Sequence, residues 1–430
     1  MRNLFGTDGV RGIYGEDLTD ELAYKLGLAL GELYEPAQFI IAHDTRESSE
    51  PIQKAIVKGL LEKGAKVRIA GILPTPAVAM ITKLLDCFGI VISASHNPYQ
   101  YNGIKIFRSG FKLPDSEEEM IESIMENISG GVQKGLLEIA PQLREIYLRT
   151  VLKLFSEINL SGIKIAIDLA NGAAITTVPE VLNALGANVV CFSNTPNGRN
   201  INENCGSQHP EFLARHIAGF DLGILHDGDA DRCVLLSEKG EEIHGDKIMG
   251  VIATKLKEEN RLRKDTIVAT IMSNKGLEDY LQNRGIKLLR VKVGDKYVLE
   301  GMLKAGASFG GERSGHIIFL DRSTTGDGLI TALEFLRLMV TTNKSSSELG
   351  AEVQDYPQIL LNVPVQDKSV VEHPLLKMEL EKHMKGPFRV VVRPSGTEKL
   401  IRVMVEGREE VRVKQLAEEL CALIRDLDRR

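Results

Sequence analysis

The sequence predicts an α/β protein with three successive α/β units, built on mixed, mostly parallel sheets, and a smaller C-terminal α+β domain around a central cleft. Amphipathic helical patterns alternate with short apolar, β-branched runs through most of the chain, which is typical of parallel sheets covered by helices. After the polar stretch 342–347 the pattern changes to closely spaced strands and one long helix. We expect domains at residues 1–150, 151–245, 246–355 and 356–430.

The first two units follow the same order of helices and strands. Residues 21–34 are amphipathic and residues 39–42 are apolar, so they predict a helix followed by a buried strand. A second helix is expected at 49–63, with Ser48 or Ser49 available as its N-cap. The other elements expected here are strands 66–72, 89–92, 163–169, 188–193 and 222–225 and helices 76–86, 142–157, 178–185 and 210–218.

The third unit repeats this architecture, and the last domain departs from it. What recurs is the order of elements and not a short sequence repeat, which excludes a solenoid. In the third unit we expect helices 247–257, 276–285 and 328–341 and strands 266–272, 287–293 and 307–310. In the last domain we expect strands 359–365, 389–392 and 400–405 and helix 409–427.

The composition excludes several classes of protein. The chain has 430 residues, 43% of them hydrophobic, and a net charge of -6, so it is not a general nucleic-acid or membrane-surface binder. Its five cysteines are scattered without a C-x-x-C pair, as expected for reduced thiols. No apolar run is typical of a signal peptide or a membrane span. We therefore expect a cytoplasmic protein.

A serine-rich loop follows the strand expected at 89–92. The apolar run stops at Ser93, and Pro98 prevents the strand from simply continuing. Ser95 therefore lies where open α/β sheets bind their ligands. Lys105 comes ten residues later, and Gly103 is expected to let the chain turn back toward the loop. A hydroxyl beside an amine or imidazole suits group transfer, although an ordinary turn remains an alternative.

Three aspartates follow the strand expected at 222–225. Asp227, Asp229 and Asp231 alternate in what we expect to be a short extended stretch, so their carboxylates should point to one side. Three like charges need a cation, and a set of oxygen ligands favours Mg²⁺. An EF-hand, suggested by Glu238 at loop position twelve, fails because Arg232 occupies the glycine position. An aspartyl-nucleophile phosphatase and a merely solvated acidic turn remain open.

Other polar loops carry residues suited to anions and hydroxyl groups. A glycine-rich N-terminal loop contains Arg11, and the loop 311–316 contains Glu312, Ser314 and His316. The last domain carries a loop with Arg393, Ser395, Gly396 and Thr397, and Arg402 lies just beyond it. Two guanidiniums, two hydroxyls and an unobstructed glycine amide suit a phosphate group. Together these loops suit a phosphorylated, hydroxyl-rich substrate.

These motifs, in this order, resemble the α-D-phosphohexomutase family along essentially the whole chain. The matching segments are 93–98, 227–232, 311–316 and 393–398. Among its members the chain is most similar to those that act on glucosamine phosphates, through 5–12, 293–297 and 401–407. The resemblance implies a reversible transfer between glucosamine 6-phosphate and glucosamine 1-phosphate, through a phosphoserine and a bound sugar 1,6-bisphosphate. Mannose or glucose phosphates are the alternative substrates.

The resemblance also implies a role for each candidate residue. Ser95 would carry the phosphoryl group, and one Mg²⁺ per subunit would be held by Ser95, Asp227, Asp229 and Asp231. Lys105 and His316 are candidates for acid and base, and His96, Arg11 and Arg232 complete the catalytic set. Glu312 and Ser314 would bind the sugar. The far phosphate would be bound by Arg393, Ser395, Gly396, Thr397 and Arg402.

Two positions depart from the pattern of the family. Lys399 stands where a proline is usual, a change that we expect to be harmless. Arg313 stands where glutamine is usual, and a guanidinium about 4 Å from a sugar ammonium would cost roughly 4 kcal/mol at an effective dielectric of about 20. Glucosamine as substrate therefore requires Arg313 to turn away or to pair with an acid. A phosphosugar-binding protein without turnover and a homodimer are left open.

Overall fold

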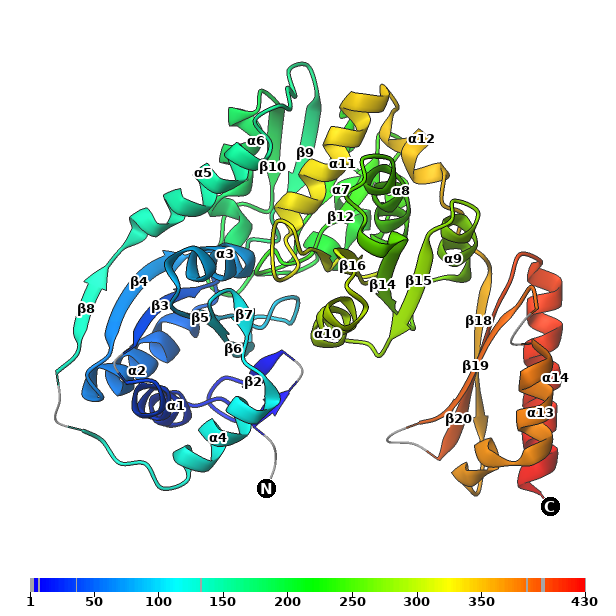
Figure 1. Ribbon diagram of the computed structural model, residues 1–430, viewed down its shortest axis with the longest axis horizontal. Coiled ribbons are helices and arrows are strands. Elements are labelled where there is room, and N and C mark those ends of the chain that lie inside the picture. Colours follow the sequence, from blue (N-terminus) through cyan, green and yellow to red (C-terminus); the bar gives the residue numbers. More distant parts are fainter. Residues whose placement is uncertain are drawn as a thin grey trace. The chain divides into compact units, whose positions relative to one another are not determined.

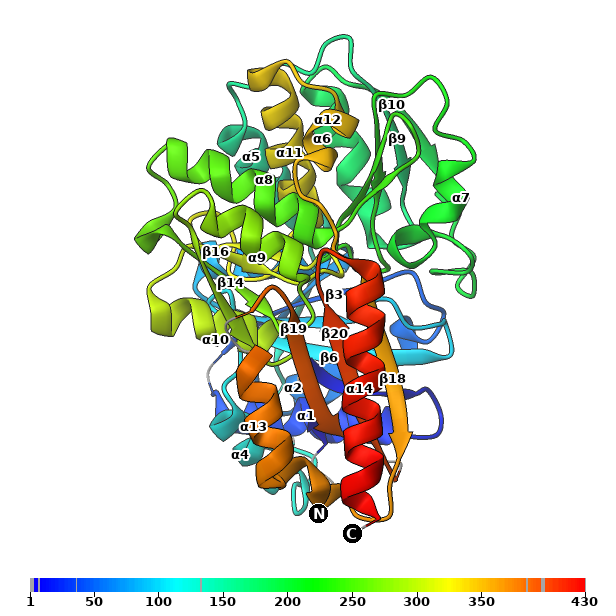
Figure 2. The ribbon, with the colours of Figure 1, turned by 90° about the vertical axis from the view of Figure 1, so that its right-hand side faces the viewer.

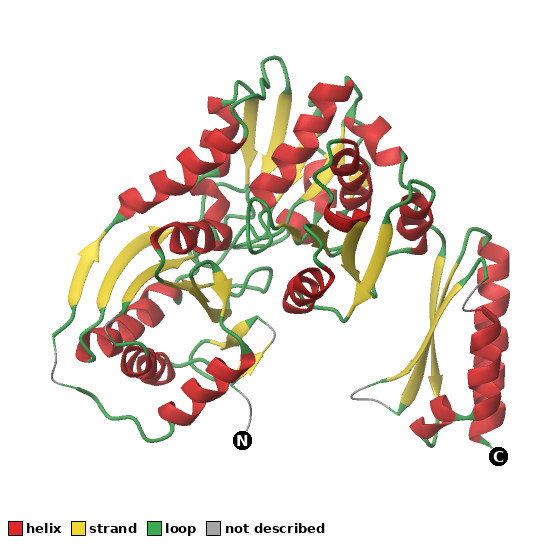
Figure 3. Cartoon of the chain, viewed as in Figure 1, coloured by secondary structure: helices red, strands yellow, loops and turns green. Residues whose placement is uncertain are grey.

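A computed structural model describes residues 4–6, 8–35, 37–131, 134–383, 386–395 and 399–429 (Figure 1). The chain divides into two compact units, which are described separately. The larger unit comprises Met1–Met272 and Leu288–Glu352, and the smaller comprises Ser273–Lys287 and Val353–Arg430. Helices and strands alternate through the larger unit (Figure 3).

The first sheet of the larger unit has the strand order β1-β2-β6-β5-β3-β4-β8, and β7 pairs with β6. Strand β3 is parallel to β4 and β5, and β4 is parallel to β8. The pairs β1–β2, β2–β6 and β5–β6 are antiparallel. Its strands are β1 (Phe5–Gly6), β2 (Gly9–Ile13), β3 (Gln38–His43), β4 (Lys66–Ile72), β5 (Phe88–Ile92), β6 (Tyr101–Arg108), β7 (Phe111–Lys112) and β8 (Leu136–Ile139).

Helices α1 and α2 pack closely because glycines lie at their contact. A Cβ atom at Gly59 would lie 2.4 Å from the Tyr24 carbonyl oxygen, and one at Gly27 would lie 2.3 Å from that of Ile56. Apolar residues of the sheet, such as Phe39 and Ile90, form one core with these helices. The helices of this part are α1 (Asp20–Leu33), α2 (Ser49–Glu62), α3 (Thr75–Leu85) and α4 (Asp115–Met125).

The second sheet has the strand order β10-β9-β11-β12-β13. Strand β9 is parallel to both neighbours, and β12 is antiparallel to β11 and β13. This topology places the loops after β9 and β11 at the same edge. The strands are β9 (Lys164–Asp168), β10 (Asn188–Phe192), β11 (Leu222–Leu225), β12 (Val234–Ser237) and β13 (Glu242–Ile243), and the helices are α5 (Arg144–Leu154), α6 (Val178–Ala184) and α7 (Pro210–Ala214).

The third sheet has the strand order β15-β14-β16-β17. Strand β14 is parallel to β16, and the short β16 and β17 form an antiparallel pair. The loop between β16 and β17 is the one expected to bind the sugar. The strands are β14 (Thr266–Thr270), β15 (Lys287–Val291), β16 (Phe309–Gly311) and β17 (Ile317–Phe319), and the helices are α8 (Gly245–Glu258), α10 (Asp295–Ala305), α11 (Gly328–Thr342) and α12 (Ser346–Ala351).

The smaller unit contains a three-stranded antiparallel sheet of order β18-β20-β19. Helices α13 and α14 cover one face of it (Figure 2). Residues such as Val403 and Leu416 form the core between the sheet and α14. The elements are α9 (Lys275–Gln282), β18 (Gln358–Pro364), α13 (Pro374–His383), β19 (Arg389–Pro394), β20 (Leu400–Glu406) and α14 (Glu410–Asp428).

Most of the elements expected from the sequence are present, but the turn expected at Gly103 is wrong. Gly103 lies inside β6, where a Cβ atom would lie 2.6 Å from the Ser93 carbonyl oxygen. Ser48 occupies the N-cap position of α2 but makes no capping hydrogen bond with its side chain. Helices α4, α10, α12 and α13 were not expected. Among the described residues, no helix has the length and apolar character needed to cross a membrane.

Candidate active site

Ser95 lies in the loop after β5, with its side chain turned toward the loop of the second sheet. It is 1% exposed and has a φ of 52°, in the left-handed region that few non-glycine residues adopt. Its amide donates to Ser93 Oγ at 3.0 Å, and its own Oγ donates to Asp227 Oδ2 at 2.6 Å. His96 Nδ1 lies 3.3 Å from the same Oγ. The hydroxyl is therefore held in one direction by its neighbours.

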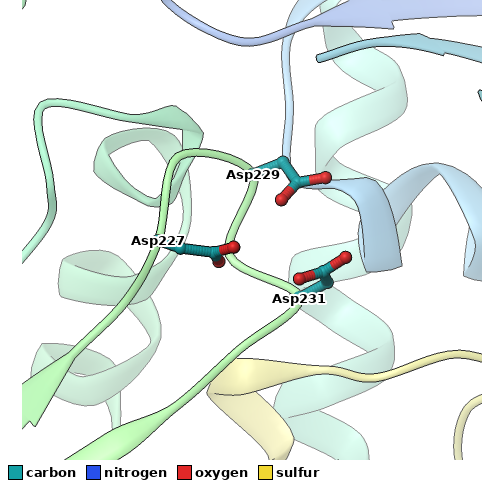
Figure 4. Close-up of side chains that lie close together, drawn as sticks. All are labelled: Asp227, Asp229 and Asp231. Carbon is teal, nitrogen blue, oxygen red and sulfur yellow. The ribbon is translucent and has the colours of Figure 1, made fainter. Parts of the chain in front are cut away.

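The three aspartates converge, but not through the extended stretch that the sequence predicted. Residues 226–233 form a turn between β11 and β12, in which Ala230 has a φ of 56° and its amide donates to the Asp227 carbonyl at 3.1 Å. Each aspartate offers a carboxylate oxygen within 4.8 Å of the others. Figure 4 shows the three carboxylates gathered on one side of this loop. The turn, not the pleat of a strand, brings them together.

The carboxylates are buried in a way that suits a divalent cation. Burial and the neighbouring Asp231 and Asp229 raise the pKa of Asp227 to about 7. Oδ1 of Asp229 and Oδ1 of Asp231 are buried without a hydrogen-bond partner among the described residues. Buried carboxylate oxygens without partners are costly. These oxygens are the donor type that Mg²⁺ prefers, so the residues fit that ion.

The pKa of Asp227 predicts how the binding of Mg²⁺ depends on pH. Below pH 7 the cation must displace a proton from Asp227. We therefore expect the apparent Kd for Mg²⁺ to fall about tenfold for each unit that the pH rises, between about pH 5 and pH 6.5. Above about pH 7.5 the Kd should level off. Isothermal titration of the unphosphorylated protein with MgCl₂ measures this, and a Kd independent of pH over the same range would contradict it.

Lys105 reaches the aspartates because β6 pairs with β5, with Lys105 opposite Val91. It is 1% exposed, and its Nζ lies 2.8 Å from Asp229 Oδ2, 3.2 Å from Asp231 Oδ2 and 3.1 Å from Asp8 Oδ2. Burial opposes the charge of Lys105, but Asp229, Asp8 and Asp231 hold its pKa well above the usual value. Lys105 is therefore a buried cation that donates hydrogen bonds to Asp229 and Asp231.

The two arginines and His96 border the same cluster. Arg11 lies on β2, not in the glycine-rich loop that the sequence suggested, and it donates to Asn97 Oδ1 at 3.2 Å. Arg232 Nε lies 3.9 Å from Asp227 Oδ2. Burial, Arg232 and Arg11 lower the pKa of His96 to about 4, so its imidazole is neutral at physiological pH. His96 therefore adds no positive charge beside Ser95 at that pH.

His316 and the sugar loop meet this cluster from the third sheet. Residues 232 and 316 form an isolated antiparallel bridge, and His316 Nε2 lies 4.0 Å from Asp231 Oδ2 and 3.6 Å from Asp295 Oδ2. Glu312 accepts from the Gly294 amide at 3.0 Å and from Ser314 Oγ at 3.3 Å. Glu312 and Ser314, the predicted sugar-binding pair, are therefore held in place by the Gly294 amide and by each other.

Arg313 pairs with an acid, as binding of an amino sugar would require. Its Nη1 lies 3.3 Å from Oδ2 of Asp246, a fully buried residue of α8. The side chain of Arg313 is 40% exposed. The guanidinium is thus engaged with a carboxylate that offsets its charge.

The smaller unit holds the residues predicted to bind the far phosphate. Arg393 on β19 lies directly opposite Arg402 on β20. Ser395 is buried, its amide donates to the Leu400 carbonyl at 2.9 Å, and Lys368 Nζ donates to its carbonyl at 2.6 Å. Gly396 and Thr397 lie outside the described residues. The two guanidiniums therefore share one end of the β19–β20 hairpin.

Several members of the cluster were not identified from the sequence. Asp8 forms ion pairs with Arg11, Lys105 and Lys112, and these three cations hold the pKa of Asp8 well below its usual value despite burial. Lys112 also pairs with Asp295. The available signals were the acid between Gly6 and Gly9 and the segment 293–297, which had served only to identify the resemblance.

Four family models match this chain, in order along its length. They are described as phosphoglucomutase/phosphomannomutase alpha/beta/alpha domains I, II and III, over residues 2–131, 145–240 and 244–356, and C-terminal domain, over residues 360–423. The order of the four segments is that of the motifs described above.

Individual proteins agree with these matches. A phosphoglucosamine mutase from Thermotoga sp. (strain RQ2) is 48% identical over 422 residues, which cover 98% of this chain and 99% of that protein. The crystal structure of a phosphoglucomutase/phosphomannomutase family protein from Burkholderia thailandensis has a TM-score of 0.83 at 21% identity, over 99% of this chain and 98% of that one. An N-acetylphosphoglucosamine mutase from Aspergillus fumigatus, solved with GlcNAc-6P and magnesium, has a TM-score of 0.63 at 17% identity, over 99% and 96% of the two chains. These two structures show the likeness of fold.

Proposed function

Because the chain belongs to the phosphoglucomutase/phosphomannomutase family, we propose that it is a phosphohexomutase that interconverts glucosamine 6-phosphate and glucosamine 1-phosphate. The observation that carries this proposal is the hydroxyl of Ser95, which donates to one of three clustered carboxylates in a buried turn. The name of the relative that is 48% identical supports the choice of sugar. The four matched segments support domains at 1–150, 151–245, 246–355 and 356–430, and we place the enzyme in the cytoplasm.

The metal of this proposal is one Mg²⁺, held by Ser95, as its phosphoryl ester, and by Asp227, Asp229 and Asp231. When bound, Mg²⁺ would neutralise the negative charge that develops on the transferred phosphoryl group. The two buried carboxylate oxygens without partners support this assignment, and so does the raised pKa of Asp227. The magnesium in the Aspergillus fumigatus structure is consistent with it.

In the proposed reaction the phosphoryl group moves between Ser95 and the sugar. The bond from phosphorus to Ser95 Oγ breaks, and a bond forms to O1 of glucosamine 6-phosphate, whose proton passes to a base at the site. The resulting 1,6-bisphosphate reorients, the bond from phosphorus to its O6 breaks as a bond to Ser95 Oγ forms, and the proton taken from O1 passes to O6. Arg11 and Arg232 stabilise the group in transit, because Arg11 contacts Asn97 of the serine loop and Arg232 lies beside Asp227, the partner of Ser95.

Lys105 and His316 take the acid and base roles in this proposal. We assign the role of acid to Lys105, which is a buried cation beside Asp8, Asp229 and Asp231. His316, beside Asp231 and Asp295, is the base. Glu312 and Ser314 bind the sugar hydroxyls. Arg393, Ser395, Gly396, Thr397 and Arg402 bind the phosphate that is not being transferred.

The choice of sugar is tested through Arg313. Because Arg313 pairs with Asp246, we expect the wild type to prefer glucosamine 1-phosphate over glucose and mannose 1-phosphates, and Arg313→Gln to change this preference by less than about threefold. Asp246→Asn removes the pairing charge and should lower the preference at least tenfold, since repulsion at about 8 Å costs roughly 2 kcal/mol. Values of kcat/KM for the three sugars measure this.

One outcome would reverse the assignment of the sugar. A wild type that prefers the neutral sugars, and that Arg313→Gln converts to a preference for glucosamine, would make the enzyme a phosphomannomutase or phosphoglucomutase. Steady release of inorganic phosphate would instead indicate a phosphatase, and binding without turnover a phosphosugar-binding protein.

A further inference from the structure

A loop of the second sheet reaches across to the backbone of the serine loop. Asn202 Nδ2 donates to the Ser95 carbonyl at 2.9 Å and to the Asn97 carbonyl at 3.2 Å. Arg46, which is 2% exposed and paired with Asp44, donates to the same two carbonyls, at 3.1 Å and 2.5 Å. Two side chains from different sheets thus hold the same pair of carbonyl groups. We call Arg46 and Asn202 the carbonyl clamp.

Asn202 is itself fixed in place by its own segment. Its φ is 57°, a left-handed conformation that asparagine and aspartate adopt more readily than other non-glycine residues, and its amide donates to the Ala170 carbonyl at 2.9 Å. The preceding residues are tied to the first sheet, because the Glu47 amide donates to the Gly198 carbonyl at 3.0 Å. The exposed ion pair between Arg199 and Glu47 adds little to this. The side-chain amide of Asn202 is therefore held in place by the hydrogen bonds of its own loop.

The carbonyl clamp holds the backbone of residues 95–97, whose conformation sets the direction of the Ser95 side chain. Ser95 has a φ of 52°, and an L-residue other than glycine pays about 1 kcal/mol or more for this conformation. Hydrogen bonds to the carbonyls on both sides of His96 favour this conformation over its relaxed alternatives. A Cβ atom at Gly228 would lie 2.6 Å from the Ser95 carbonyl oxygen, so the aspartate loop packs on the same group. Asn97 in turn accepts from Arg11 through its side chain.

We propose that Asn202 is a positioning residue for phosphoryl transfer, which acts by holding the backbone of the serine loop so that Ser95 Oγ faces Asp227. The inference rests on the proposed function. Among the residues that the structure describes, the side chain of Asn202 donates to backbone carbonyls only. Glu312 and Ser314, which we assign to the sugar, lie on another loop. Its effect is therefore on the transfer step and not on the binding of the sugar. A misplacement of about 1 Å can cost about 10²-fold in rate.

The test compares two variants that keep the backbone conformation of residue 202 with one matched control. Asn202→Asp retains the shape and the left-handed preference but replaces the donor with an acceptor, and Asn202→Gly removes the side chain without strain. Arg199→Gln removes the exposed ion pair of the same loop and leaves both clamp contacts in place. We expect kcat for glucosamine 1-phosphate to fall about 10- to 100-fold in both Asn202 variants, with KM within about twofold of the wild type. The control should stay within twofold in both.

Deuterium uptake by the serine loop is a second readout that does not depend on the sugar. Backbone amides of residues 93–97 should exchange faster in Asn202→Asp and Asn202→Gly than in the wild type or Arg199→Gln. Unchanged kcat and unchanged uptake, or a loss confined to KM, would overturn the inference. A wild type inactive on glucosamine phosphates would overturn the proposed function, while the uptake experiment would still decide whether Asn202 holds the loop.

Discussion

Ser95→Ala should lower kcat for the interconversion of glucosamine phosphates by at least about 10⁴-fold, because the variant has no oxygen to accept the phosphoryl group. Ser95 Oγ donates to Asp227 at 2.6 Å in the wild type, so alanine also leaves that carboxylate without this partner. Intact-mass analysis of the purified wild type should show a phosphorylated fraction, and the variant should show none. Coupled assays for glucosamine 1-phosphate measure the rate.

Ser93→Ala is the matched control for this prediction. Ser93 lies two residues away, is fully buried and accepts the Ser95 amide through Oγ, so it supports the loop but does not face the aspartates. We expect Ser93→Ala to retain the phosphorylated fraction by intact mass, even if its rate falls. Full activity in Ser95→Ala, or phosphate retained in Ser95→Ala and lost in Ser93→Ala, would refute the assignment of the nucleophile.

Asp229→Asn should lower kcat about 10²–10³-fold and weaken the dependence of the rate on Mg²⁺, by analogy with the loss of one charged or polar stabiliser of a transition state. Asp229 accepts from Lys105 Nζ at 2.8 Å and from Thr75 Oγ1 at 2.6 Å. Because asparagine keeps an acceptor oxygen for these donors, the variant should still fold. Titration of the rate with MgCl₂, together with a thermal melt, separates loss of the metal from loss of structure.

Glu238→Gln is the control for the metal site. In an EF-hand Glu238 would be a ligand, but in this structure it accepts from Ser346 Oγ at 2.7 Å and from the Ser347 amide at 2.9 Å. We therefore expect Glu238→Gln to leave the response to Mg²⁺ unchanged. An Asp229→Asn enzyme with the wild-type response, or a wild type that is insensitive to chelators, would count against the metal site.

Much of the fold could be predicted because most of its strands are short, apolar runs that lie between helical patterns. Strands β4 and β11 have the bounds that the sequence predicted. Strand β6 was missed because its pattern is broken by two polar residues, Asn102 and Lys105, that are nevertheless buried. Their burial depends on partners more than fifty residues away in the chain, Ser48 for Asn102 and Asp229 for Lys105. No local pattern carries that information.

In the candidate site, too, some residues could be predicted from local patterns and others depend on distant parts of the chain. Ser95, the three aspartates and His316 could be named because each follows a predicted strand in a loop rich in polar residues. The conformation of the aspartate loop could not be predicted, because it depends on a left-handed Ala230. Lys112 and Asp295 form an ion pair although they are 183 positions apart in the chain. Asn202 donates to backbone carbonyls of the serine loop, and because every residue has such a carbonyl, the sequence of that loop does not reveal the contact.

The proposed reaction is tested most directly by ³¹P NMR of the purified wild type with glucosamine 6-phosphate, MgCl₂ and a catalytic amount of a sugar 1,6-bisphosphate. We expect the signal of glucosamine 1-phosphate to appear and to reach equilibrium with the 6-phosphate, with no growth of the inorganic phosphate signal. Inorganic phosphate released without the 1-phosphate, or a spectrum unchanged over many hours at high enzyme concentration, would contradict the account.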